Sequence, residues 1–120
     1  MVIISNNGFI SLNRGDSLAV PLFINMGTAA APIRFNIVKH KKAVVYFGVM
    51  EPNQNFEDAL IRQRYNYTSE LTSYNDIVIR LKSMDTEYLL PGKYFYMIKL
   101  KLYDEQVLTI VPKTEFYVLE

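Results

Sequence analysis

The sequence predicts an all-β protein, and three observations support this fold class. Apolar and charged residues alternate with a period of two in several segments, a pattern that places apolar side chains on one face of a strand and polar side chains on the other. Residues typical of turns separate these segments. The segments also recur about every 8–12 residues, which is the spacing expected of a β-sandwich or a small β-barrel.

The alternation is clearest near the C-terminal end of the chain, where Ile98, Leu100 and Leu102 are separated by Lys99 and Lys101. Three earlier segments show the same pattern, namely 18–24, 33–37 and 77–82. Pro21 lies within the first of them and indicates an edge strand or a bulge, because proline has no backbone N–H to donate to a neighbouring strand.

Segment 43–50 is apolar throughout and rich in Val, Tyr and Phe. This composition predicts a central strand that is covered on both faces. A buried helix is the less suitable interpretation, because the run is only eight residues long and contains Gly48.

Segment 55–65 admits two interpretations. A short helix would place Phe56, Ala59, Leu60 and Gln63 on one face. A strand would place Ala59, Ile61 and Tyr65 inward, and the strand is the preferred interpretation.

Five segments carry turn residues: 13–16, 26–28, 39–42, 51–53 and 91–92. The tripeptide Arg14-Gly15-Asp16 is interpreted as a turn rather than as an adhesion motif. Gly15 tolerates a positive φ, and Asp16 can bond to its own backbone just before a strand. The turns divide the chain into about seven strands.

Length and charge restrict the function further. The 120 residues suit one domain, 1–120. With 13 basic and 12 acidic side chains, the net charge of +1 gives no general attraction to nucleic acid or to an anionic membrane. The chain contains no cysteine, and its longest apolar run is far below the ~20 residues of a membrane-spanning helix. The N-terminus also lacks the features of a signal peptide, so we expect a cytoplasmic protein.

The residues that could support catalysis are few. His40 is the only histidine and lies among three lysines, which is typical of an exposed turn. The acidic pairs at 57–58, 85/87 and 104–105 are interpreted as solvated loop charges. The sequence lacks the residue spacing of a calcium-binding loop. It also gives no sign that two of these carboxylates face each other across a cleft, as they must in a glycosidase. We therefore expect no metal, no cofactor and no enzymatic activity.

Aromatic residues are abundant, with nine Tyr and seven Phe. Tyr65, Tyr67 and Tyr74 lie in a polar stretch in which strand alternation cannot bury all three. Exposed tyrosines suit an interaction surface, and they can also stack on sugars or bases. The other interpretation is that they pack on the faces and edges of a sheet.

Two parts of the chain resemble a known family. The first contains Arg14-Gly15-Asp16 before a strand, followed by segment 33–37, and the second contains Pro91-Gly92-Lys93-Tyr94, followed by segment 107–116. This layout resembles the N-terminal domain of phage baseplate upper proteins and of related small structural proteins of phages and prophages that infect Gram-positive bacteria.

The resemblance implies an immunoglobulin-like antiparallel β-sandwich of about seven strands. It also implies a tail- or baseplate-associated protein that binds other virion proteins or copies of itself, as a homo-oligomer, and that has no catalytic residues. Such a protein would be found in the virion, and in the cytoplasm of the bacterial host during assembly. The alternative is a carbohydrate-binding β-sandwich module that uses exposed tyrosines.

Overall fold

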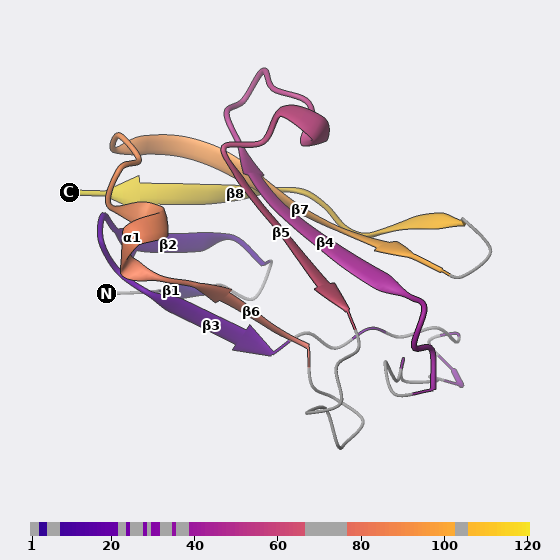
Figure 1. Ribbon diagram of the computed structural model, residues 1–120. Helices are drawn as coiled ribbons and strands as arrows, with labels where there is room; N and C mark the ends of the chain where they lie inside the picture. Colours follow the sequence, from indigo (N-terminus) through magenta and orange to yellow (C-terminus); the bar gives the residue numbers. More distant parts are fainter. Residues whose placement is uncertain are drawn as a thin grey trace.

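The computed structural model describes residues 3–4, 8–21, 24, 28, 30–31, 35, 39–66, 77–102 and 106–120. Its strands form two sheets (Figure 1). The strands are β1 (Ile3–Ile4), β2 (Ile10–Asn13), β3 (Leu18–Pro21), β4 (Val44–Met50), β5 (Ile61–Asn66), β6 (Val78–Leu81), β7 (Gly92–Lys101) and β8 (Val107–Leu119). Helical structure within these residues is confined to a 3-10 turn, η1 (Phe56–Asp58), and one short helix, α1 (Ser83–Thr86). The predicted all-β class is confirmed.

The larger sheet has the order β1-β2-β8-β7-β4-β5, and the smaller sheet pairs β3 with β6. β2 runs parallel to β8, with Ile10 beside Phe116, whereas the other pairs are antiparallel. The larger sheet is therefore mixed and not purely antiparallel as predicted. Parallel neighbours need a long connection, and here most of the chain lies between the two strands.

The core is formed by the inward faces of both sheets. The predicted alternation is confirmed on β6 and β7, where Ile79, Leu81, Ile98 and Leu100 are buried while Arg80 is exposed. Core residues of the other strands include Ile10, Leu12, Leu18, Val45, Phe47, Val49, Ile61, Phe116 and Val118. From the predicted strand at 33–37 the structure describes only Phe35, which is buried and donates its backbone N–H to the carbonyl of Ile24; Ile33 and Ile37 lie outside the described residues.

β4 is a central strand, as predicted, between β5 and β7. Its outer face is covered at one end only, where η1 packs over Gly48. A Cβ atom on Gly48 would lie 3.2 Å from Cβ of Ala59 and 3.3 Å from the ring of Phe56. Glycine within a strand often marks such a close approach. At the other end of the strand, the outward residues Val44 and Tyr46 are only half-buried.

Segment 55–65 contains a 3-10 turn followed by a strand. Ala59 and Ile61 are buried, and Tyr65 packs against the core, as the preferred interpretation predicted. Leu60 is 47% exposed, which is incompatible with the helical face that the other interpretation required.

The predicted turn at 13–16 is confirmed. Gly15 has a φ of 87°, and the backbone N–H of Asp16 donates to the carbonyl of Asn13. In return, the N–H of Asn13 donates to Oδ2 of Asp16 over 2.9 Å. The turn at 39–42 is closed by a bond from the N–H of Ala43 to the carbonyl of His40.

α1 connects this first turn to the rest of the fold. Thr86, at the end of α1, is fully buried. Its Oγ1 donates to the carbonyl of Asp16 over 2.8 Å and accepts from the N–H of Gly15 over 3.1 Å. The start of α1 is capped by Asp85, whose Oδ2 accepts from the N–H of Lys82 over 2.7 Å.

Candidate interaction surfaces

The outward side chains of β5, β4 and β7 form an open face of the larger sheet. In the strand register Tyr46 lies between Arg64 and Lys99, and the next row places Gly48 beside Arg62. These residues share a face because side chains two apart on a strand point the same way. The face therefore carries a tyrosine surrounded by cations.

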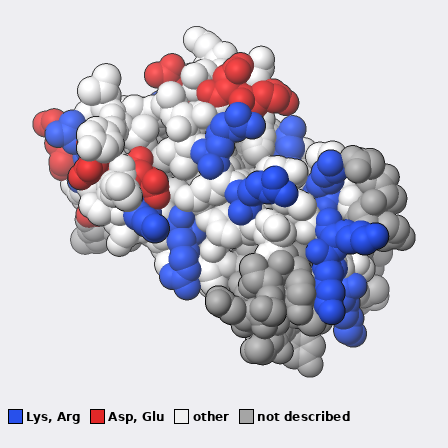
Figure 2. Space-filling model, viewed as in Figure 1, with Lys and Arg blue, Asp and Glu red and all other residues white. Residues whose placement is uncertain are grey.

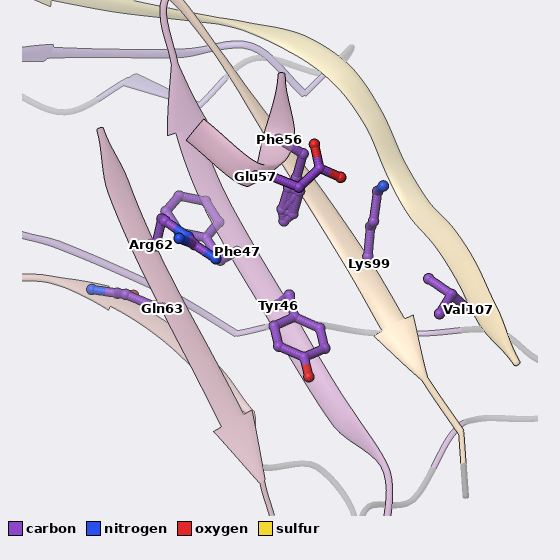
Figure 3. A pocket seen from close by; sticks show the side chains of 8 residues that line it. All are labelled: Tyr46, Phe47, Phe56, Glu57, Arg62, Gln63, Lys99 and Val107. Carbon is purple, nitrogen blue, oxygen red and sulfur yellow. The ribbon is translucent and has the colours of Figure 1, made fainter. Parts of the chain in front are cut away.

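A groove of about 290 Å³ lies on this face, with η1 as one wall. It is lined by Tyr46, Phe47, Phe56, Glu57, Arg62, Gln63, Lys99 and Val107 (Figure 3). Nζ of Lys99 lies 4.9 Å from the ring centroid of Phe56, within the range of a cation–π contact. We call this feature the basic groove.

Charge is unevenly distributed over the surface. In the view of Figure 2, Lys and Arg side chains gather over the middle and right of the molecule, and Asp and Glu concentrate along the upper and left margins. Arg62 and Arg64 are exposed, and neither forms an ion pair with another described residue. The ion pair between Lys93 and Glu115, 3.8 Å long, lies near the opposite end of β7. The basic groove therefore keeps positive charge that no carboxylate in the described part of the chain neutralises through direct contact.

A second hollow, of about 510 Å³, lies between β5 and α1. Three of its lining side chains are large, apolar in part and exposed: Leu60 (47%), Met84 (62%) and Tyr88 (83%). We call these three residues the apolar patch. Large exposed apolar side chains that line one hollow, rimmed here by Arg62, Gln63 and Asp85, are a feature of interaction sites.

Of the three tyrosines proposed from the sequence, only Tyr65 falls within the described residues; Tyr67 and Tyr74 lie outside them. Tyr65 is half-buried. Its hydroxyl donates to the side-chain carbonyl of Gln63 and accepts the N–H of Arg80 over 3.0 Å. Burial is the main cause that raises the pKa of Tyr65 above its usual value. Tyr65 thus connects β5 to β6 across the two sheets, and its hydroxyl is engaged within the chain.

The sequence reasoning missed Tyr46, Tyr88 and Met84. Tyr46 was assigned to a strand covered on both faces because it lies in an apolar run. Such a run does not reveal that η1 covers only one end of the outer face of β4. Polar and apolar residues alternate from Ser83 to Tyr88 as they would on a strand, so the pattern gave no signal for the short helix α1 or for the exposure of Met84 and Tyr88.

The acidic pairs at 57–58 and 85/87 are not brought together in the described residues, and the pair at 104–105 lies outside them. Glu57 and Asp58 are exposed on η1, whereas Asp85 caps α1. Among the residues that the structure describes, no three His, Cys, Asp or Glu side chains are placed to hold a metal ion. His40 is half-buried and its ring stacks on Phe35, with centroids 5.2 Å apart. Neither described helix is long and apolar enough to cross a membrane.

Comparison of the chain with models of known protein families, with curated proteins and with solved structures finds no match. The surfaces described above are therefore interpreted from their own chemistry.

Proposed function

We propose that this chain is a structural protein of a phage or prophage virion, associated with the tail or baseplate, and that it acts by binding other proteins. The apolar patch carries the second part of the proposal, namely that the chain acts by binding other proteins. A water-exposed Met84 and Tyr88 beside a hollow cost free energy unless something covers them. Met and Tyr are also enriched at protein–protein interfaces relative to the rest of the surface.

The strand order supports an immunoglobulin-like sandwich as the framework. In that fold, strands G, F, C and C′ form one sheet and strands B and E belong to the other. β8, β7, β4 and β5 follow the first order, and β3 and β6 correspond to the second pair. The inward faces of the two sheets share one core, which is the packing that a sandwich requires.

The virion assignment rests on the sequence resemblance, and the positions of two turns are compatible with it. The turn at 13–16 leads into β3, and Gly92, directly after Pro91, begins β7. These are the two places where the family layout opens a strand. The partners expected from the resemblance are neighbouring virion proteins or further copies of this chain.

The test compares capture of virion proteins by wild type and by Met84→Ser/Tyr88→Ser. Each protein is immobilised and exposed to a lysate of the induced prophage, and bound proteins are identified by mass spectrometry. We expect the double variant to lose the tail or baseplate proteins that wild type binds. Leu119→Ser is the control, because Leu119 is also exposed but lies at the end of β8. Equal capture by all three proteins, or capture of no virion protein by wild type, would contradict the proposal.

The basic groove favours a second candidate, a carbohydrate-binding module. Tyr46 and Phe56 provide aromatic surface on an open sheet face, and Arg62, Gln63 and Lys99 provide donors beside them. In this case Tyr46→Ala abolishes binding on a glycan array, whereas Met84→Ser/Tyr88→Ser leaves it unchanged. Wild-type protein that binds no glycan on the array rules out this candidate.

A further inference from the structure

We infer that the basic groove of one copy binds the acidic turn η1 of a second copy, which forms a two-fold, face-to-face dimer. The inference deepens the proposed function, on which it rests, by naming one partner and the surface that receives it. Arg62 and Gln63 line both hollows, but the residues that carry the two proposals differ, so each proposal is tested with its own substitutions.

The opposite charges lie on one face of the molecule. Arg62, Arg64 and Lys99 are on the outer face of β5 and β7, and Glu57 and Asp58 are on η1 beside them. In a two-fold interface the same patch meets itself, so that each residue i that contacts j is matched by j contacting i. A patch with a basic half and an acidic half is therefore complementary to its own rotated copy.

These charges are not neutralised within the described part of the chain. Glu57 lines the basic groove together with Arg62 and Lys99, yet no ion pair within 4.0 Å connects them there. Charges that a chain leaves apart at its own surface can be brought together by a partner. Complementary potentials across an interface then speed association and fix its register.

The acidic turn is held in place before binding. Phe56 packs over Gly48, Lys99 contacts the ring of Phe56, and the N–H of Leu60 donates to the carbonyl of Val49 over 2.8 Å. η1 therefore presents Glu57 and Asp58 from a fixed position on the sheet. Preorganisation of this kind reduces the entropy lost on binding.

The residue types and the net charge also favour a copy of the same chain. Arg and Tyr are, with Trp, the residues enriched among interface hot spots, and Tyr46 lies in the strand register beside Arg64. The chain carries a net charge of +1, so long-range repulsion between copies is small. The attraction between the opposite charges of the two faces then determines whether two copies associate.

The experiment uses two charge reversals on the full chain, Arg62→Glu/Arg64→Glu and Glu57→Lys/Asp58→Lys. Sedimentation equilibrium is recorded for each protein up to about 1 mM, at low and at high salt. We expect wild type to dimerise, with an affinity that falls as salt is added. Each variant alone should associate at least tenfold more weakly, because its face and its turn then carry mainly charge of the same sign. An equimolar mixture of the two variants should recover association, because the acidic face of one meets the basic turn of the other.

The control is Lys39→Glu/Lys42→Glu, which changes the net charge as much as the first variant at two exposed positions outside the groove. It should dimerise like wild type. Monomeric wild type at the highest concentration would overturn the inference, and so would a mixture of folded variants that fails to associate. If Met84→Ser/Tyr88→Ser still loses virion proteins in that case, the proposed function stands and only the dimer is wrong.

Discussion

At the scale of single residues, Thr86 is a fully buried polar side chain that bonds to a distant part of the chain. It joins the turn at 13–16 to α1, about seventy positions later in the chain, through two hydrogen bonds of one hydroxyl. A buried polar group without partners costs ~1–3 kcal/mol. The hydroxyl therefore holds the entrance to β3 against the end of α1.

Thr86→Val should lower the free energy of unfolding by ~1–3 kcal/mol, because valine keeps the shape but leaves the N–H of Gly15 and the carbonyl of Asp16 without this partner. Thr86→Ser keeps the hydroxyl and loses one methyl group, so its cost should be smaller, about 1 kcal/mol. Urea denaturation of the two variants provides the measurement. A valine variant as stable as the serine variant would show that these bonds contribute nothing.

Nothing in the sequence predicted this contact. Threonine is common on strands and in loops, and the partner atoms of Thr86 are backbone atoms, whose position depends on the fold. The turn that it contacts was predictable, because Gly15 and Asp16 have local conformational preferences. Local conformational preferences can therefore be predicted from the sequence, whereas a contact between residues far apart in the chain cannot.

At the scale of elements, the strands with clean alternation were predictable and the connections between them were not. β6 and β7 bury the residues that the period of two selected. Segment 55–65 divides into η1 and β5, because Phe56 finds space over Gly48 on the neighbouring strand. The parallel pairing of β2 with β8 joins the two ends of the described chain, and no short-range pattern specifies such a pair.

The alternation on β7 can be tested with neighbouring residues. Leu100 is fully buried, so Leu100→Ala should cost ~2–5 kcal/mol of stability. Lys99 points outward and its Nζ lies over the ring of Phe56, so Lys99→Ala should cost ~1 kcal/mol or less. Thermal unfolding followed by circular dichroism compares them. Similar costs at both positions would contradict the assignment of the two faces.

At the scale of the whole molecule, we expect buried tyrosines to make the stability of the fold sensitive to alkaline pH. Tyr96 lies in the core between Phe47 and Phe116, and its hydroxyl donates to the carbonyl of Gly8. Burial raises the pKa of Tyr96 above the usual value of 10.0, and burial is also the largest cause for Tyr65 and Tyr94.

A folded-state pKa above the unfolded value means that the folded state holds the proton more tightly. The stability from this source is fully present below about pH 10 and is lost as the pH rises through the folded-state pKa. We therefore expect the free energy of unfolding to decline above pH 10, and to decline less steeply in Tyr96→Phe. Urea titrations on both sides of pH 10 measure the slopes, and parallel slopes in the two proteins would contradict this role of Tyr96.

The parallel pair of β2 and β8 has a consequence for mechanical load. If the two ends of the described chain are pulled apart, β2 is drawn backwards and β8 forwards along the same line, because the strands point in the same direction. The force then shears the hydrogen bonds of the pair together, whereas an antiparallel hairpin pulled at its open end opens one bond at a time. Forced unfolding depends on the height of the unfolding barrier, and shear raises the force that is needed to cross it. We therefore expect the β2–β8 pair to transmit tension between the two ends of the described chain while the core that these strands cover remains folded.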